Sequence, residues 1–207
     1  MQDKTELTIH AYNENFSNFN SKFMNYGPYS KQVAEFANYL DDGFKILDIG
    51  CGPGNVAKQL CSLKQLNYTG IDLSFNMVDV AKRNVPSGVF TVQDSRTAHF
   101  PTEYFNAIIL SFSIVHLEDE EAKVVLKNAI RWLQNGGYIY LSFMEGKKAG
   151  FETTSFSLQP IYFNYFYEDE IKKILKEFGI DCLRSVRQDY LEPDGSNTTD
   201  IFLFGRK

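Results

Sequence analysis

A glycine-rich turn directly after an apolar run is the feature of this chain with the clearest chemical meaning. Asp48 lies in the run, and Gly50, Gly52 and Gly54 follow at every second position. Residues without a Cβ atom let the backbone approach a ligand closely and adopt positive φ angles. Residues 55–64 then have the apolar spacing of a helix. Strand, glycine turn and helix together predict a nucleotide cradle that opens at a helix N-terminus.

The spacing of the glycines bears on which nucleotide the cradle would hold. A dinucleotide-binding fingerprint has its third glycine five residues after the first, which here is Asn55. The third glycine instead comes one residue early, at Gly54. A nicotinamide cofactor is therefore the weaker alternative.

Acidic residues also end the next two predicted strands. Residues 67–72 form a short strand that ends in Asp72, and residues 89–93 form another that is followed by Asp94. A carboxylate at such a strand end can accept hydrogen bonds from both hydroxyls of a ribose. Leu73 offers an apolar surface for a purine, and Asp94 can accept from an exocyclic amine.

Taken in order, these motifs resemble the cofactor motifs of the class I S-adenosylmethionine-dependent methyltransferases. The resemblance rests on residues 48–54 (Asp-Ile-Gly-Cys-Gly-Pro-Gly), 72–74 (Asp-Leu-Ser) and 93–95 (Gln-Asp-Ser), and it continues through residues 105–111 and 132–140. The last two segments are similar to the family's fourth strand and to the turn before its fifth. The resemblance covers residues 45–143 and continues more weakly to the end.

The resemblance implies a role for each matching residue. The glycine turn would hold the methionine part of the cofactor, with Asp48 beside its amino group. Asp72 would bind both ribose hydroxyls, Leu73 would pack on adenine, and residues 94–95 would lie near the adenine edge. Residues 111–112 would border the transferred methyl group. The predicted cofactor-binding residues are Asp48, Gly50, Cys51, Gly52, Gly54, Asp72, Leu73, Met77, Asp94, Ser95, Ser111 and Phe112.

Methyl transfer from a sulfonium depends mainly on alignment and on exclusion of water, so a proton-transfer residue is not required. His116 and Glu145 are the candidate catalytic bases, because they follow the predicted fourth and fifth strands at the ligand-binding edge. The alternative for His116 is a structural role in its loop. Cys51 is interpreted as a small space-filling residue. We predict no metal site, because the His and Cys residues lack ligand spacing.

Aromatic residues near the N-terminus recur at intervals of four, three, four and three. They are Tyr12, Phe16, Phe19, Phe23 and Tyr26. If residues 14–25 are helical, these rings share one side of the helix. One interpretation is a lid over the cofactor and an aromatic substrate pocket. The other is a helix packed on the sheet edge or on a second subunit.

A second aromatic segment, at residues 145–167, separates the predicted fifth strand from the last helix. Its length and aromatic content favour a substrate-binding insertion over disorder, and a hydrophobic plug is the alternative. The predicted substrate-contacting residues from the two aromatic segments are Tyr26, Phe23, Tyr12, Tyr162 and Phe156.

The rest of the chain alternates between predicted strands and helices, which is typical of an α/β doubly wound sheet. Helices are predicted at 75–83 after the N-cap Ser74, at 119–133 before Gly136-Gly137, and at 169–178; strands are predicted at 138–143, 181–190 and 197–204. We expect a single Rossmann-like domain over residues 1–207, with seven mostly parallel strands, helices on both faces and an antiparallel last strand. Residues 1–40 would form a helical cap, 45–143 the cofactor half and 144–207 the substrate side.

Composition limits the partners. The 207 residues are 43% hydrophobic and carry a net charge of −5, without a clustered basic stretch, which disfavours nucleic acid. The sequence has no apolar run of membrane-spanning length and no signal peptide, and its three cysteines fit a reducing compartment. We expect a cytoplasmic monomer or homodimer that does not bind membranes.

The predicted function is in-line transfer of a methyl group from S-adenosylmethionine to O or N of a small molecule. Alternatives are a protein methyltransferase, a non-catalytic S-adenosylmethionine-binding module and, more weakly, a nicotinamide enzyme.

Overall fold

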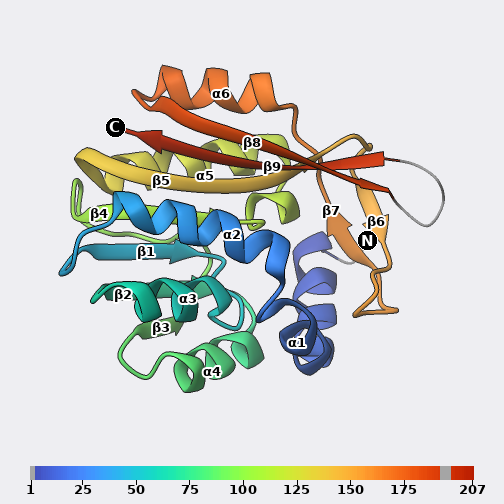
Figure 1. Ribbon diagram of the computed structural model, residues 1–207. Coiled ribbons are helices and arrows are strands. Elements are labelled where there is room, and N and C mark those ends of the chain that lie inside the picture. Colours follow the sequence, from blue (N-terminus) through green and yellow to red (C-terminus); the bar gives the residue numbers. More distant parts are fainter. Residues whose placement is uncertain (1–2, 192–196) are drawn as a thin grey trace.

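A computed structural model describes residues 3–191 and 197–207 (Figure 1). Seven strands form one sheet in the order β3-β2-β1-β4-β5-β9-β8. They are β1 (Lys45–Ile49), β2 (Asn67–Asp72), β3 (Val89–Val92), β4 (Phe105–Ser111), β5 (Leu133–Glu145), β8 (Asp181–Leu191) and β9 (Asn197–Arg206). Strands β1 to β5 pair in parallel, and β9 is antiparallel to both of its neighbours. The predicted doubly wound, mostly parallel sheet is confirmed.

Helices cover both faces of the sheet. They are α1 (Lys4–Phe23), α2 (Gly27–Phe36), α3 (Asn55–Leu63), α4 (Phe75–Asn84), α5 (Asp119–Trp132) and α6 (Glu168–Glu177), with short 3₁₀ turns at Ala37–Tyr39 and Ile114–His116. Helices α2, α3 and α4 contribute to one core cluster, while α5 and α6 contribute to the other. This arrangement confirms the prediction of helices on both faces.

Strand β4 shows why the sheet is buried on both sides. Ile108 and Leu110 pack into the cluster beneath α5 and α6, whereas Ala107 and Ile109 pack into the cluster beneath α2 and α3. Side chains of a strand point alternately to opposite faces, so a continuous apolar run serves both clusters.

Two of the predicted helix starts are confirmed by capping contacts. Ser74 accepts a hydrogen bond from the backbone N–H of Met77 at the start of α4, 3.2 Å away. At the start of α5, Glu118 and Glu121 form a reciprocal capping box. Such caps satisfy N–H groups that the helix itself leaves without partners.

Contrary to the prediction, the glycine pair Gly136-Gly137 does not end α5. The helix ends at Trp132 and β5 begins at the next residue. The register between β4 and β5 shifts here, and a Cβ on Gly137 would lie 2.8 Å from the carbonyl oxygen of Asn106. The glycine pair therefore allows the register of β5 to shift against β4, at a point where the backbones of these two strands approach closely.

The N-terminal helix also begins earlier than the predicted residue 14. It starts at Lys4 and is kinked at Asn15, where φ is −113° and ψ is 17°. The segment before α6 forms a small antiparallel hairpin of β6 (Gly150–Glu152) and β7 (Ile161–Phe163). Helix α1 packs against β7, so both aromatic segments meet at the carboxyl end of the parallel strands (Figure 1).

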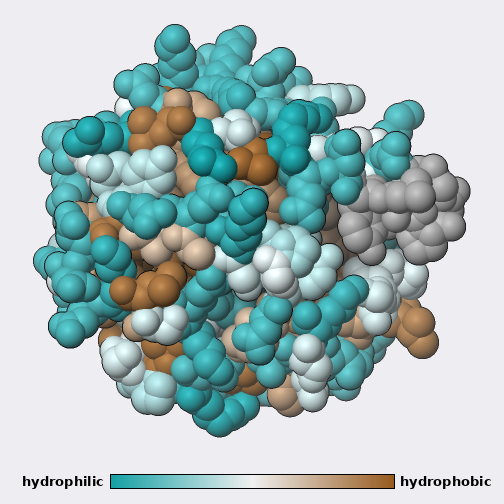
Figure 2. Space-filling view, viewed as in Figure 1, coloured by the Kyte–Doolittle hydropathy of each residue, from teal (hydrophilic) through white to brown (hydrophobic). Residues whose placement is uncertain are grey.

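The face shown in Figure 2 is mostly hydrophilic, with apolar residues in separate small patches. Among the described residues, no helix has the length and apolar character needed to span a bilayer.

Candidate active site

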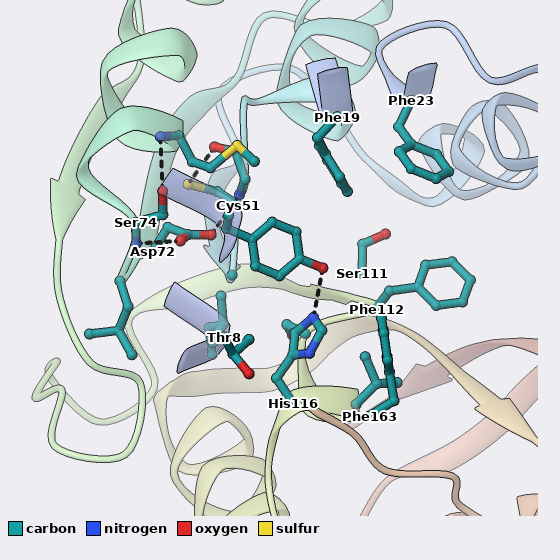
Figure 3. Close-up of a pocket in the computed structure, with 18 of the residues that line it drawn as sticks. Thr8, Phe19, Phe23, Cys51, Asp72, Ser74, Ser111, Phe112, His116 and Phe163 are labelled. Carbon is teal, nitrogen blue, oxygen red and sulfur yellow. Dashed lines mark hydrogen bonds between the residues drawn. The ribbon is translucent and has the colours of Figure 1, made fainter. Parts of the chain in front are cut away.

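A cavity of about 640 Å³ lies at the carboxyl ends of the parallel strands. Its floor comes from the glycine turn after β1 and from the ends of β2 and β4, and its roof comes from α1, α2 and the β6–β7 hairpin. Figure 3 shows side chains from these elements around one hollow, with Asp72 and Cys51 toward one end and Phe112 and Phe163 toward the other. Ligands of open α/β sheets bind at this edge.

The three glycines of the turn have different tasks. All have positive φ, at 73° for Gly50, 52° for Gly52 and 77° for Gly54. A Cβ on Gly50 would lie 2.4 Å from Cβ of Ser113, and one on Gly54 would lie 3.2 Å from Ala81. A Cβ on Gly52 would have only an atom of Phe19 nearby, at 4.0 Å, so Gly52 faces the hollow.

Gly54 is outside the described lining of the cavity. The prediction that it binds cofactor is not supported by this geometry, because the residue begins α3 and lets that helix pack on α4. Gly50, Cys51 and Gly52 do line the cavity. The backbone N–H groups of Gly50 and Cys51 donate to the carbonyl of Ile71, which fixes the turn to β2.

Asp72 ends β2 with its carboxylate held in one orientation. One oxygen accepts from the N–H of Gly52 at 2.9 Å and the other from the N–H of Ser74 at 2.8 Å. Burial raises the pKa of this carboxyl, and the backbone hydrogen bonds oppose that rise. Leu73 and Met77 line the cavity beside it. A carboxylate fixed at this strand end matches the predicted ribose contact.

Asp48 is buried, with 1% of its surface exposed, and lines the cavity. The hydroxyl of Tyr68 donates to one carboxylate oxygen at 2.8 Å. The other oxygen has no hydrogen-bond partner among the described residues. Burial raises the pKa of Asp48 to about 7. A buried acceptor without a protein partner is suited to a donor supplied by a ligand.

Residues 94–95, which were predicted to lie near the edge of the adenine ring, are held by Arg96, a residue that was not predicted to belong to the site. Arg96 donates to both carboxylate oxygens of Asp94, at 3.0 and 2.7 Å, and to Glu121 at 2.7 Å. Asp94 consequently lies outside the described cavity lining, contrary to the predicted contact, while Ser95 and Arg96 belong to it. An arginine two residues after a strand-end acid gave no distinctive signal in the sequence.

The residues at this end fit an adenosyl cofactor. Gly52 leaves room for a close backbone approach, Asp48 presents an acceptor for an ammonium group, and Asp72 presents a carboxylate for a ribose. Leu73 and Met77 supply an apolar surface for a purine ring.

Ser111 and Phe112, at the end of β4, line the cavity between the glycine turn and the end near Phe163. Phe112 has a φ of 49°, unusual for a bulky residue. Its N–H donates to the backbone carbonyl and to the hydroxyl of Ser142, each at 3.1 Å. This backbone conformation goes with a ring that stacks on Tyr29, with centroids 4.8 Å apart. Strained residues are concentrated at functional sites.

His116 pairs with Tyr12 inside the cavity. The histidine Nδ1 lies 2.9 Å from the backbone carbonyl of Tyr162, which can only accept, so Nδ1 carries the proton. The hydroxyl of Tyr12 therefore donates to Nε2, 3.0 Å away (Figure 3). Burial lowers the pKa of His116 to about 4 and raises that of Tyr12. Both residues are neutral near pH 7.

Aromatic side chains enclose the space between this pair and the glycine turn. Tyr12, Phe19, Phe23, Tyr26, Phe156, Phe163 and Tyr165 line the cavity. Phe19 meets Phe156 edge to face, with centroids 5.0 Å apart, so α1 and the β6–β7 segment close over the hollow together. Of the predicted aromatic stripe, Phe16 is outside the described lining.

Tyr162 is a predicted substrate residue that the structure moves out of the cavity. Only its backbone carbonyl serves the site, through His116, and its largely buried ring packs against Lys4 and Phe151. The neighbouring Phe163 lines the cavity instead. Side chains alternate along β7, and the sequence alone does not reveal which residues face inward.

Glu145, the second candidate base, is also away from the reacting space. Its carboxylate accepts from the backbone N–H of Glu168 at 3.1 Å and pairs with Arg187 at 3.4 Å. The described cavity lining does not include it. Its position after β5 caps α6, so we correct the prediction of a catalytic role.

The comparisons with known proteins agree with this geometry. A family model described as a methyltransferase domain matches residues 46–137. This match confirms the predicted resemblance to class I S-adenosylmethionine-dependent methyltransferases over the segment that runs from β1 into β5.

Curated relatives resemble only part of this chain. It is 32% identical to phosphoethanolamine N-methyltransferase 1 of Arabidopsis thaliana over 117 residues, which are 55% of this chain and 23% of the relative. It is 35% identical to the ubiquinone/menaquinone biosynthesis C-methyltransferase of Campylobacter jejuni over 120 residues, 55% of this chain and 50% of that one. The chain thus spans between a quarter and half of these relatives.

A solved structure shows the same fold over the whole chain. Phosphoethanolamine N-methyltransferase 2 of Haemonchus contortus, in complex with S-adenosylmethionine, has a TM-score of 0.75 at 16% identity. The match covers 100% of this chain and 60% of that one.

Proposed function

We propose that this chain transfers the methyl group of S-adenosylmethionine to O or N of a small molecule. The observation that carries the proposal is one continuous cavity. It joins the cradle at Gly52 and Asp72 to an aromatic space with a polar Tyr12–His116 pair, beneath a roof of α1 and β6–β7. The family cofactor, when bound, supplies an electrophilic methyl group. Everything else is done by the protein's own residues.

Binding and orientation are the tasks of the cradle. The carboxylate of Asp72 would hold the ribose, because two backbone N–H groups already fix its direction. Asp48 would accept from the amino group, since one of its oxygens lacks a partner among the described residues. Ser111 and Phe112 would border the methyl group at the end of β4.

Tyr12 and His116 would orient the methyl acceptor. Because the hydroxyl proton of Tyr12 is directed to Nε2 of His116, the tyrosine oxygen keeps lone pairs for a hydrogen bond from the acceptor. An O–H or N–H group that donates to Tyr12 would turn its own lone pair toward the methyl group. With a pKa of about 4, His116 would be neutral near pH 7, with its proton on Nδ1 and with Nε2 as the hydrogen-bond acceptor.

The roof supports a small acceptor over a protein. The aromatic rings of α1 and the β6–β7 segment meet above the cavity, which restricts its mouth and excludes water from the reacting groups. The named activities of the two curated relatives also concern small molecules. One of these relatives is a C-methyltransferase, so the relatives do not fix the acceptor atom. The choice of O or N is therefore part of our proposal.

Calorimetric titration with S-adenosylmethionine, S-adenosylhomocysteine and NADH tests the cofactor. We expect binding of both adenosyl compounds at micromolar concentrations and none of NADH. Lack of binding of both adenosyl compounds would refute the proposal. Binding without turnover, against a panel of small amines, phenols, acids and phosphoethanolamine, would favour the non-catalytic alternative.

Variants then test the acceptor-orienting pair. We expect Tyr12→Phe and His116→Ala to lower kcat by about tenfold or more while S-adenosylhomocysteine affinity is kept. In the double variant the two decreases in kcat should not multiply, because each single variant already breaks the same Tyr12–His116 hydrogen bond. Tyr39→Phe, outside the described cavity lining, is the matched control. Unchanged kcat in both site variants would exclude this role.

A further inference from the structure

A second polar pair lies in the cavity, apart from Tyr12 and His116. The hydroxyl of Tyr29, in α2, donates to a carboxylate oxygen of Asp200 at 2.9 Å. Asp200 is in β9, opposite Met144 of β5, and only 6% of its surface is exposed. All three residues line the cavity. A carboxylate is thus buried within the ligand space.

Aromatic rings surround Tyr29, the hydrogen-bond partner of this carboxylate. Tyr29 stacks on Phe112 with centroids 4.8 Å apart, and Tyr26 meets Tyr29 edge to face at the same distance. Phe202 packs against both Tyr29 and Phe112, at 5.6 and 5.7 Å. Aromatic faces attract cations, and a buried carboxylate is stabilised by a positive partner.

The charges around the whole cavity are predominantly acidic. Of the described residues that line it, the basic ones are Lys22 and Arg96. Arg96 is neutralised by Asp94 and Glu121, and Lys22 donates to Ser155 in the roof. The acidic lining residues are Asp48, Asp72, Glu152 and Asp200, and of these Glu152 is paired with Lys147 at 3.4 Å. A cationic ligand is therefore favoured over an anionic one.

We propose that the methyl acceptor carries an ammonium group, which binds at Asp200 beside the rings of Tyr26 and Tyr29. This inference rests on the proposed methyltransferase function and specifies its substrate class. Asp200 is then a specificity-determining residue. The two oxygens of a carboxylate offer about four acceptor sites, so a hydrogen bond from Tyr29 is compatible with an ammonium at the same carboxylate.

The ammonium is an anchor and a second group accepts the methyl. Strand β9 lies two places from β4 in the sheet, about 10 Å at ordinary strand spacing, whereas Ser111 and Phe112 end β4. Asp200 also stabilises the protonated amine, which has no lone pair to attack with. The methyl-accepting O or N would therefore lie elsewhere on the same molecule, toward Tyr12 and His116.

Three phenols that differ in one terminal group provide the test. Tyramine ends in an ammonium, tyrosol in a neutral hydroxyl and 4-hydroxyphenylacetate in a carboxylate. Each is titrated by calorimetry into the full chain saturated with S-adenosylhomocysteine. We expect tyramine to bind at least about tenfold more tightly than tyrosol, and 4-hydroxyphenylacetate most weakly.

Variants assign that preference to the carboxylate. Asp200→Asn should remove most of the tyramine preference and leave tyrosol affinity unchanged, and Tyr29→Phe should reduce the preference partly. Asp189→Asn is the matched control, because Asp189 is exposed in the adjacent strand β8 and lies outside the described cavity lining. Unchanged S-adenosylhomocysteine affinity in each variant shows that the cavity is intact.

The outcomes separate this inference from the proposed function. Failure of S-adenosylhomocysteine to bind the wild type overturns the methyltransferase proposal and this inference with it. Normal S-adenosylhomocysteine binding overturns only the ammonium inference if the acid binds as well as the amine. The same holds if none of the three probes binds at millimolar concentration, or if Asp200→Asn keeps the preference.

Discussion

Asp48 shows how burial can prepare a single carboxylate for a cationic ligand. Its pKa is raised from 3.8 to about 7 because it is desolvated, although Tyr68 donates a hydrogen bond to it. An ammonium group that binds at the second oxygen favours the ionised form and lowers this pKa. Binding must therefore release a proton from Asp48 whenever the pH is below about 7.

We expect the affinity for S-adenosylhomocysteine to rise with pH up to about 7 and to fall at more alkaline pH, where the α-amino group of the ligand loses its proton. Asp48→Asn should weaken binding and remove the rise on the acid side. Calorimetry in buffers with different ionisation enthalpies measures the proton release. An affinity in the wild type that is constant from about pH 5 to about pH 7 would contradict this assignment.

The same shift has a consequence for stability. Between pH 3.8 and about 7, the folded state holds a proton on Asp48 that the unfolded state has lost. Stability from this group is present at low pH and is lost as the pH rises through that window. Asp48→Asn should therefore have a higher Tm than the wild type near pH 8.

Gly52 offers a second prediction at the scale of one residue. Gly52→Ala should greatly weaken S-adenosylhomocysteine binding, because the added Cβ enters the ligand space, and should lower the free energy of unfolding by about 1–2 kcal/mol through its positive φ. Gly50→Ala should destabilise more, since its Cβ would lie 2.4 Å from Ser113. Titration and urea denaturation measure the two effects.

Gly43→Ala is the matched control for backbone strain. Gly43 has a φ of 84° with no described atom within 4 Å of an added Cβ, and it is not in the described cavity lining. It should lose a similar amount of stability and keep ligand affinity. Equal affinity losses in the Gly43 and Gly52 variants would show that strain alone explains the effect.

At the scale of elements, α1 is fixed to the start of α4 by one asparagine. The side chain of Asn13 accepts from the hydroxyl of Ser74 at 2.7 Å and from the N–H of Asn76 at 3.3 Å. Asn76 donates in turn to the backbone carbonyl of Asn13 at 2.8 Å. The roof of the cavity is therefore tied to the helix that follows Asp72, so opening of α1 requires these bonds to break.

Asn13→Ala should increase the dissociation rate of S-adenosylhomocysteine about fivefold, as expected if about 1 kcal/mol of hydrogen bonding is lost from the closed roof. Stopped-flow displacement measures this rate. Glu14→Ala changes the adjacent exposed residue and should have no effect. If the Asn13 and Glu14 variants release the ligand equally fast, Asn13 does not hold the roof closed.

At the scale of the whole molecule, the two core clusters share one sheet. Trp132, the single tryptophan of the chain, is fully buried in the cluster beneath α5 and α6. The other cluster lies beneath α2 and α3 on the opposite face. Strand β4 contributes side chains to both clusters, so loss of either cluster exposes one face of the sheet on which the other cluster packs.

We expect one unfolding transition in urea, with coincident curves from Trp132 fluorescence and from circular dichroism. S-adenosylhomocysteine at a hundred times its Kd should add about 2.7 kcal/mol to the free energy of unfolding. NADH at the same concentration should add nothing. Separate midpoints for the two probes would show that the faces unfold independently.

Local patterns made much of the fold and the cofactor end of the cavity predictable. The apolar runs and acidic ends of β1 and β2, the cap at Ser74 and the turn at Gly52 are each encoded within a few residues. The end of α5 was predicted within one residue, but the role of Gly136-Gly137 was mispredicted, because this pair belongs to a long-range irregularity of β5. The correction at Asp94 has a similar origin, since Glu121 and Thr5 help to hold the arginine that engages it.

By itself, the sequence determined the order of the strands, the cradle after β1 and the strand-end carboxylates at Asp48 and Asp72, because short-range periodicity and turn chemistry specify them. Only the tertiary structure decided which aromatic residues enter the cavity and which polar groups meet there. Tyr12 and His116 are 104 residues apart, and Tyr29 and Asp200 are 171 apart. Such contacts depend on how α1, α2, β7 and β9 pack around the sheet, and packing between distant segments leaves no local pattern to read.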